Sequence, residues 1–302
     1  MKRPLVLVTG GSGQLGKTLQ RHWNASSISA SFELLAVDVE HIDITDSVDL
    51  LSYLDQLQPD WIINAAAYTH VDLAELHESE AVSVNASAVS TIANWCAETG
   101  NRLIQISTDF VFDGNTSRPY SPKSETAPLN VYGASKLEGE RYVRQLLPHT
   151  GWVVRTSWLY SEYGSNFVKS MLRLCNELDE IKVIDDQVGS PTSTHTLTQF
   201  LFKIIRSSSA ADVFHWTDGG EISWYDFAIE IRDQALNLGK INKDVSIIPI
   251  SSAKYYSTAT RPSYSVLNRD LSLSLLDREP ENWKAALKVV LQSLPRPDHV
   301  DM

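Results

Sequence analysis

Cysteine is nearly absent from this chain, which has two, Cys96 and Cys175, among 302 residues. Two thiols are too few for a disulfide framework or for a zinc site built from cysteine. Both lie in apolar stretches typical of helices, so we expect buried thiols that behave as small hydrophobic groups.

Basic residues are also scarce relative to acidic ones. Lysine and arginine number 26 against 37 aspartates and glutamates, which gives a formal net charge of −11. An acidic surface repels a phosphate backbone, so we expect no nucleic-acid partner. A pocket can still be locally basic, and the net charge therefore does not argue against a small anionic ligand.

Long hydrophobic runs are missing as well. No stretch approaches the roughly 20 apolar residues of a membrane span, and the run LVLV near the start is too short for a signal peptide. We therefore expect a cytoplasmic protein with no membrane partner. The eight histidines have no ligand spacing such as H-x-x-x-H, and the acidic stretch 72–81 is typical of a solvated helix face. We expect no metal bound by the protein's own side chains, although the sequence leaves open whether Mg²⁺ assists.

Short apolar runs alternate with amphipathic segments along the first half of the chain. The runs are nearly continuous in apolar residues, as in strands covered on both faces, and lie at 5–9, 34–38, 61–65, 102–107 and 152–157. Helical patterns between them occupy 14–23, 47–56, 78–99 and 133–147. This alternation predicts an α/β protein with a Rossmann-like, doubly wound parallel sheet.

The pattern becomes less regular after about residue 157. Helical and strand-like segments alternate without a fixed period, and a last helix is predicted around Asn282–Gln292. We expect a first domain of residues 1–157, rejoined by about 190–212. A smaller mixed α/β lobe that binds the substrate would comprise 158–189 and 213–302.

A glycine-rich loop, VTGGSGQLGKTLQ, follows the first predicted strand. Gly10, Gly13 and Gly16 allow a tight turn, close approach of the backbone to a diphosphate, and close packing of the next helix on the strand. Asp38 ends the second strand, where an acid binds the adenosine ribose hydroxyls. The first domain is therefore predicted to bind NADH or NADPH. The Asp38 carboxylate favours NADH, but Lys17 and Arg21 could offset it, so the preference stays open. The predicted cofactor-binding residues of this region are Gly10, Ser12, Gly13, Gln14, Leu15, Gly16 and Asp38.

Tyr132 and Lys136 are separated by four positions in NVYGASKLEGE. On a helix this spacing places both side chains on one face. A nearby ammonium stabilises a phenolate, so we expect Lys136 to lower the pKa of Tyr132 towards the working range. Thr108 lies at the carboxyl end of the fourth predicted strand, where such sheets bind ligands. These three residues are the predicted catalytic set.

Several blocks of the sequence resemble extended short-chain dehydrogenases that act on nucleotide sugars. The shared blocks are the glycine loop, NAAAYTHVD (64–72), STDFVF (107–112) and YGASK. The more specific blocks RTSWLY (155–160), VIDDQVGSPT (183–192) and ATRPSYSVLN (259–268) resemble the dTDP-4-dehydrorhamnose reductase family over nearly the whole chain. The resemblance implies NAD(P)H-dependent reduction of a 4-keto sugar carried on dTDP, for rhamnose of surface polysaccharide.

The resemblance also implies roles for individual residues. Thr108 and Tyr132 would hold the keto oxygen, Tyr132 would donate the proton, and Lys136 would support both tyrosine and cofactor. Further cofactor contacts would come from Asp43, Ile44, Asn64, Ala65, Ala66 and Ala67, and substrate contacts from Thr69, Val71, Thr108, Phe110 and Trp158. Arg261 suits binding of the dTDP phosphates, and a structural ion pair is an equally good interpretation.

One position departs from the family pattern. The family usually has S-T-D-Y-V-F, and this chain has Phe110 in place of that tyrosine, so one hydroxyl contact to the sugar is missing. Phe110 also argues against a related dehydratase, which needs a glutamate there. Another nucleotide-sugar reductase or epimerase remains an alternative, as does a non-catalytic subunit resembling the regulatory subunit of methionine adenosyltransferase. The sequence is compatible with a monomer or a homodimer.

Overall fold

The main sheet of the protein is parallel and has six strands. The computed structural model describes residues 2–207, 212–276 and 282–295. The strand order is β10-β5-β4-β3-β1-β2, and each neighbouring pair runs parallel. The strands are β1 (Leu5–Thr9), β2 (Glu33–Val37), β3 (Trp61–Asn64), β4 (Arg102–Thr108), β5 (Gly151–Thr156) and β10 (Val213–His215). The predicted doubly wound α/β fold is confirmed.

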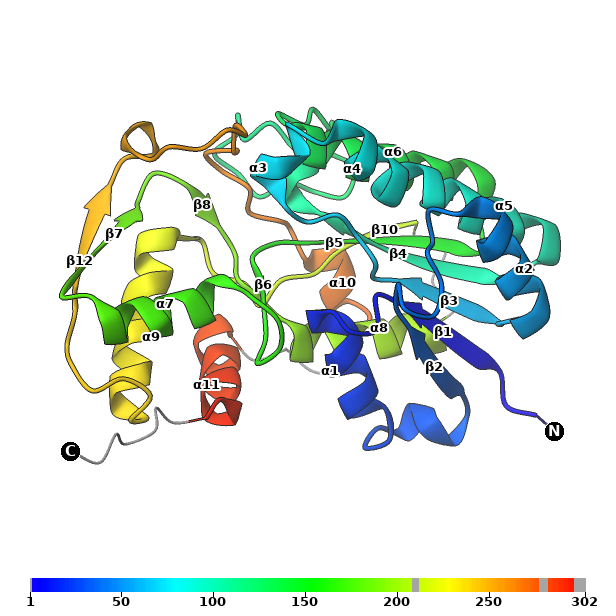
Figure 1. The fold of residues 1–302 in the computed structure, drawn as a ribbon, viewed down its shortest axis with the longest axis horizontal. Helices are drawn as coiled ribbons and strands as arrows, with labels where there is room; N and C mark the ends of the chain where they lie inside the picture. The colour runs from blue at the N-terminus through cyan, green and yellow to red at the C-terminus, as the bar shows by residue number, and fades with distance from the viewer. Residues whose placement is uncertain (1, 208–211, 277–281, 296–302) are drawn as a thin grey trace.

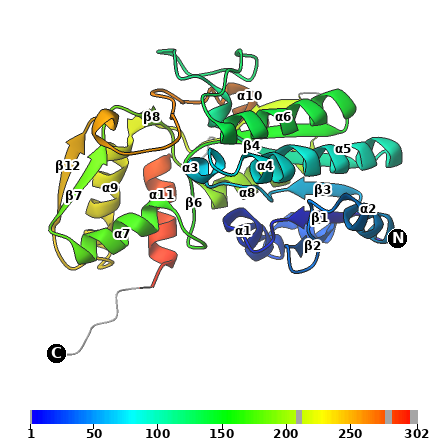
Figure 2. The same ribbon diagram turned by 45° about the horizontal axis from the view of Figure 1, so that its top comes forward.

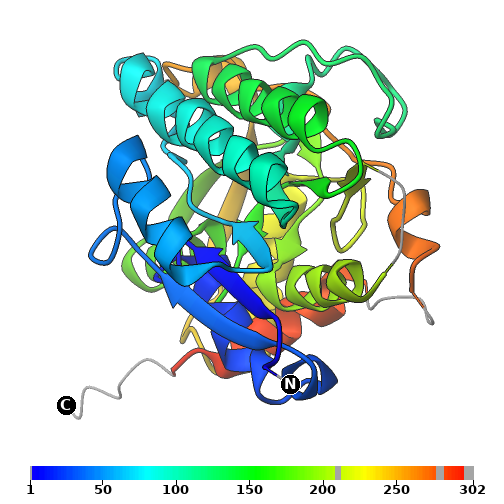
Figure 3. The same ribbon diagram turned by 90° about the vertical axis from the view of Figure 1, so that its right-hand side faces the viewer.

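Helices cover both faces of this sheet, as Figures 1 and 3 show. On one face, α1 (Gln14–Trp23) and α8 (Thr194–Arg206) pack against strand side chains such as Val8 and Ile104. On the other, strand side chains such as Leu7 and Leu103 form a second core. The helices there are α2 (Ser47–Leu57), α5 (Ala88–Thr99) and α6 (Val131–Leu146). Alternate residues of one strand thus enter different cores, which explains their continuous apolar sequence.

The single long helix predicted over 78–99 has three parts. It begins as α4 (Glu78–Val82), passes through a π-helical stretch, Ser83–Ser87, and continues as α5. Within that stretch, the Asn85 side chain accepts a hydrogen bond from the Tyr68 backbone N–H and donates to the Tyr68 carbonyl, both at 3.0 Å. The π-helical turn therefore fixes the chain that follows β3 and leads into the short helix α3 (Val71–Ala74).

A smaller lobe lies beside the sheet domain, at the left of Figures 1 and 2. Its apolar core includes Met171, Phe227, Ile247 and Leu287. The Ser223 side chain and its partner Asp226 form a capping box at the start of its longest helix. The elements of the lobe are α7 (Phe167–Glu177), β7 (Glu180–Ile184), β8 (Val188–Gly189), β11 (Ile222–Ser223), α9 (Trp224–Asn237), β12 (Ser246–Ile250) and α11 (Trp283–Ser293).

The chain passes between the two parts more often than we predicted. Strand β10 pairs with β5, so residues 213–215 lie in the main sheet and not in the lobe where we had placed them. The short helix α10 (Asp270–Leu273) contacts β10. A two-residue pair, β6 (Leu159–Tyr160) with β9 (Thr192–Ser193), joins the two parts. Residues 208–211, 277–281 and 296–302 of the predicted boundaries lie outside the described residues.

Candidate active site

A cavity of about 920 Å³ lies at the carboxyl ends of the sheet strands, between the sheet and the lobe. This edge is where open parallel sheets bind ligands. Nearly all residues predicted from the sequence line it: Gly10, Ser12, Gly13, Gln14, Leu15, Gly16, Asp38, Asp43, Ile44, Ala65, Ala66, Ala67, Thr69, Val71, Thr108, Phe110, Tyr132, Lys136, Trp158 and Arg261.

Asn64 is the exception, because it stands behind the cavity wall. It is fully buried. Its side-chain oxygen accepts a hydrogen bond from the Thr9 hydroxyl at 2.5 Å, and its amide nitrogen donates to the Gln105 side chain at 2.7 Å. Asn64 therefore fastens three neighbouring strands beneath the cavity and does not line it.

The glycine loop has the geometry of a diphosphate cradle. Gly10 has a φ of +69°, and a Cβ there would come within 2.8 Å of the Ala66 backbone nitrogen. A Cβ on Gly16 would collide with the Gly10 carbonyl oxygen. Gly13 is the N-cap of α1 and has no side chain that could accept a hydrogen bond from the backbone N–H groups of the first turn. The free N–H groups of this turn suit an anion, so the residues present fit the diphosphate of a dinucleotide.

Asp38 follows β2 directly and faces the same cavity. Its carboxylate accepts hydrogen bonds from the backbone N–H groups of Ser12 at 2.7 Å and Val39 at 2.8 Å. Partial burial opposes ionisation of Asp38, but these bonds outweigh it and lower the pKa. Lys17 and Arg21 do not line the cavity, because Lys17 lies over the Tyr163 ring and Arg21 pairs with Glu162.

Thr108, Tyr132 and Lys136 meet in the cavity from two elements. Thr108 ends β4, whereas Tyr132 and Lys136 lie one turn apart on α6. A Cβ on Gly133 would collide with the Phe110 carbonyl oxygen, so glycine is what lets the helix approach the strand end. The Phe110 and Tyr132 rings then meet edge to face with centroids 5.7 Å apart.

The electrostatics of Tyr132 differ from our expectation. Burial raises the pKa of Tyr132 to about 12, a hydrogen bond with Thr108 lowers it in part, and the Asp109 charge raises it. Burial lowers the pKa of Lys136 to about 8. The Lys136 ammonium donates to the Ile106 carbonyl at 2.7 Å. The expected lowering of the Tyr132 pKa is thus not seen, and the phenol keeps its proton at neutral pH.

Asp109 is a residue of this site that we did not predict from the sequence. Asp109 is among the cavity-lining residues, and its carboxyl group accepts a hydrogen bond from the Thr108 hydroxyl at 3.1 Å. Burial raises the pKa of Asp109 to about 6. Its position between two predicted site residues, Thr108 and Phe110, was the available signal.

A buried ion pair beneath the cavity was also missed. Glu140 and Arg155 are joined at 2.6 Å with almost no exposed side-chain surface. The Ser107 hydroxyl, on the cavity wall, donates to Glu140 at 2.5 Å. Glu140 lies one turn beyond Lys136 on α6, and its charge opposes the effect of burial on the Lys136 pKa. The i, i+4 spacing of lysine and glutamate in SKLEGE was the sequence signal.

The lobe side of the cavity is aromatic. Trp158 has a φ of +48° and stacks on Trp224 with ring centroids 3.6 Å apart. A Cβ on Gly189 would lie 2.7 Å from the Trp158 indole, so glycine is needed there. Trp224 also lines the cavity.

Arg261 lines the cavity and also forms an ion pair. Its guanidinium lies 2.6 Å from the Asp72 carboxylate and contacts the Ser257 hydroxyl. This hydrogen-bonded guanidinium holds the pKa of Asp72 well below its usual range. Both interpretations of Arg261 are therefore compatible with its position.

Neither a metal cluster nor a membrane span is found in the described part of the chain. Within the ranges 2–207, 212–276 and 282–295, no three His, Cys, Asp or Glu side chains are grouped so as to hold a metal ion. No helix within those ranges is long and apolar enough to cross a bilayer.

Comparison with known proteins gives the family. Residues 3–296 match the family model described as RmlD substrate binding domain. The chain belongs to this family. Among its curated relatives, the dTDP-4-dehydrorhamnose reductase of Aggregatibacter actinomycetemcomitans is 38% identical over 94% of this chain and 97% of its own. The dTDP-4-keto-6-deoxy-D-glucose reductase of Streptomyces niveus is 37% identical, with 87% and 88% covered.

A solved structure of the family is also closely similar. The dTDP-4-dehydrorhamnose reductase of Bacillus anthracis, in complex with NADP, is 35% identical and superposes with a TM-score of 0.88 over 96% of this chain and 99% of that one. Membership of the RmlD substrate binding domain family, with reductases as near full-length relatives, makes this chain an oxidoreductase.

Proposed function

We propose that this protein reduces the 4-keto group of dTDP-4-dehydro-L-rhamnose to give dTDP-L-rhamnose, with NADH or NADPH as the reductant. The observation that carries the proposal is the meeting of Thr108, Tyr132 and Lys136 in one cavity with a glycine-loop cradle. Near full-length similarity to reductases of this name supports it.

The dinucleotide would occupy the sheet side of the cavity. The α1 N-terminus and Gly13 would hold the diphosphate, Asp38 the adenosine ribose, and Asp43 and Ile44 would lie at the adenine. The bound reduced nicotinamide would supply the hydride that adds to sugar C4.

The chain itself would handle the proton and the developing negative charge. The keto oxygen gains charge as hydride adds to its carbon, and Tyr132 would donate a proton to it. A pKa of about 12 suits a group that must start protonated. Thr108 would hydrogen-bond to the same oxygen. Lys136, one turn away on α6, would stabilise the phenolate that remains on Tyr132.

The sugar nucleotide would occupy the lobe side. Trp158, held by Trp224, and Phe110 would form apolar walls against the sugar, with Thr69 and Val71 on the sheet side. Arg261 would meet the dTDP phosphates while paired with Asp72. A phenyl ring at 110 offers no hydroxyl, and one relative is named for a D-sugar. The second candidate substrate is therefore dTDP-4-keto-6-deoxy-D-glucose.

The test measures the oxidation of NADH and of NADPH by their absorbance, with each of the two keto sugars as substrate. We expect rapid oxidation with the L-sugar, and a higher kcat/KM with the D-sugar would favour the second candidate. Dinucleotide binding with no turnover of either sugar would favour the binding-only alternative.

The catalytic assignment is tested by Tyr132→Phe. We expect turnover to fall at least about 1,000-fold, because the proton donor is lost, while the Kd for NADPH changes less than about twofold. Tyr142→Phe is the matched control, since Tyr142 lies on the same helix but does not line the cavity. Normal turnover by Tyr132→Phe would refute the mechanism.

A further inference from the structure

A short segment of the chain crosses over the start of helix α1. The segment Ser161–Asn166, here named the strap, connects β6 to α7. Gly164 and Ser165 of the strap line the cavity. No sequence motif predicted a role for the strap, and none of its residues belongs to the proposed catalytic set.

The strap is fastened to the first residue of α1. The Gln14 side-chain oxygen accepts hydrogen bonds from the Ser161 hydroxyl at 3.0 Å and from the Asn166 amide at 2.9 Å. A Cβ on Gly164, which has a φ of +61°, would lie 3.1 Å from Gln14 Cγ. The strap therefore faces the N-terminal turn of α1, which the proposed function assigns to the diphosphate.

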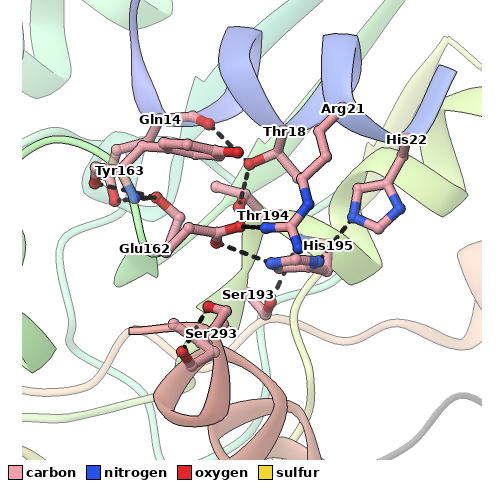
Figure 4. Close-up of polar contacts among 12 residues, drawn as sticks. Gln14, Thr18, Arg21, His22, Glu162, Tyr163, Ser193, Thr194, His195 and Ser293 are labelled. Carbon is pink, nitrogen blue, oxygen red and sulfur yellow. Dashed lines mark hydrogen bonds and ion pairs between the residues drawn. The ribbon is translucent and has the colours of Figure 1, made fainter. Parts of the chain in front are cut away.

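One strap side chain, Glu162, ties it to both helices on that face of the sheet. One carboxylate oxygen contacts the Arg21 guanidinium of α1, and the other lies 2.8 Å from His195 Nε2 of α8. His195 Nδ1 in turn lies 2.8 Å from His22 Nε2 of α1. Figure 4 shows this chain of contacts from Arg21 and His22 to Glu162 and His195.

Glu162 is held as a carboxylate although little of it is exposed. Its side chain is 8% exposed. Burial opposes ionisation, but hydrogen bonds from its own backbone N–H and from His195 outweigh it and lower the pKa. A buried carboxylate that accepts from donors on two separate helices fixes the position of the segment that carries it.

We propose that Glu162 is a positioning residue for dinucleotide binding, because it holds the strap against α1 and so completes the diphosphate site from the side of the lobe. The inference rests on the proposed function, in which the dinucleotide lies at α1. Glu162 does not touch the ligand. It removes the entropy cost of ordering Gly164 and Ser165 when the ligand binds.

The test is Glu162→Gln, which keeps the shape of the side chain. The amide removes the negative charge and keeps only one accepting oxygen, so both contacts lose their charge assistance and the contact with His195 needs its other tautomer. We expect the Kd values for NADPH and for ADP-ribose to rise together by about fivefold to twentyfold, equivalent to about 1–2 kcal/mol. ADP-ribose keeps the diphosphate and lacks the nicotinamide. At saturating dinucleotide, kcat and the KM for the sugar nucleotide should stay within about twofold.

Two further variants separate positioning from folding. Arg21→Gln removes the positive charge paired with Glu162 at a half-exposed side chain, and should raise both Kd values by about twofold to fivefold. Glu177 is the last residue of α7, the helix that follows the strap. Glu177→Gln removes an exposed ion pair with Arg173 and should change neither Kd. The inference would be overturned if Glu162→Gln lost activity only in proportion to its loss of folded protein, while the folded fraction bound the dinucleotide with an unchanged Kd.

The wild-type protein distinguishes this inference from the proposed function. If it binds neither NADPH nor ADP-ribose, both proposals fail together. If it binds both ligands and the Glu162→Gln and Arg21→Gln variants bind them equally well, the role of Glu162 is refuted while the proposed reduction stands. If the Kd for NADPH rises and the Kd for ADP-ribose does not, the strap acts away from the diphosphate, and the inference is wrong.

Discussion

Replacing Glu140 by glutamine removes the negative member of the ion pair beneath the active site. The two side chains of the pair are 1% and 2% exposed. Arg155 would then keep its charge in a dry environment, since arginine stays protonated. The neighbouring His215 supplies no negative charge; burial and then the Arg155 charge lower the pKa of His215 to about 3, so it stays neutral.

The size of the effect follows from this burial. Removing one partner of a buried pair costs about 3–5 kcal/mol, because the remaining charge is uncompensated. With an m-value near 3 kcal/mol/M for a chain of this size, the urea midpoint should fall by about 1–1.7 M. The double variant Glu140→Gln/Arg155→Met removes the stranded charge as well, and should regain at least about half of the loss.

The assay is urea unfolding, monitored by circular dichroism. Glu138→Gln is the control on the same helix, because its ion pair with Arg141 is solvent-exposed and contributes about 0–1 kcal/mol. A free energy of unfolding for Glu140→Gln within about 1 kcal/mol of the wild type would refute the reasoning. So would a double variant less stable than the single one.

Three other predictions concern the cavity. Burial lowers the pKa of Lys136 to about 8, whereas Tyr132 stays protonated in this range. We therefore expect kcat/KM to be constant below about pH 8 and to fall above it as the Lys136 ammonium is lost. A profile that is flat to about pH 10 would contradict the role of Lys136. Because the folded pKa of Lys136 lies below the ordinary value of 10.5, the unfolded state binds more protons between about 8 and 10.5, and this group adds stability as the pH rises through that window. Asp38→Asn removes the negative charge that would repel the 2′-phosphate of NADPH, and it keeps an oxygen that accepts from the Ser12 N–H. The ratio of kcat/KM with NADPH to kcat/KM with NADH should therefore rise about tenfold. An unchanged ratio would show that Asp38 does not select the cofactor.

The sequence predicted the sheet and the cavity edge because both follow from local patterns. Continuous apolar runs indicated strands with two covered faces, and glycine spacing between a strand and a helix indicated the cradle. The residues predicted to line the cavity do so, apart from Asn64. Its place next to Ala65 in the chain gave no sign that its side chain turns away from the cavity into the space between strands.

What the sequence did not predict depends on contacts between distant segments. The strand β10 looked like part of the lobe because it follows the connecting stretch, and only its pairing with β5 shows otherwise. The Tyr132 pKa was predicted from its spacing to Lys136, whereas burial, which spacing does not report, decides its direction. Glu162 contacts Arg21, which lies 141 positions earlier in the chain, and His195, which lies 33 positions later. No sequence motif predicts contacts over such separations.

The late arrival of β10 bears on how the protein is made. Helix α8 covers one face of the sheet with Phe200 and Leu201, and β10 forms the edge of the sheet. Both are synthesised after α7, β7 and β8 of the lobe. A nascent chain that ends near residue 157 has five sheet strands but lacks α8, so that apolar face is open to other chains. The sheet domain therefore completes its folding only after part of the lobe has left the ribosome, and the period before that is when aggregation is a risk.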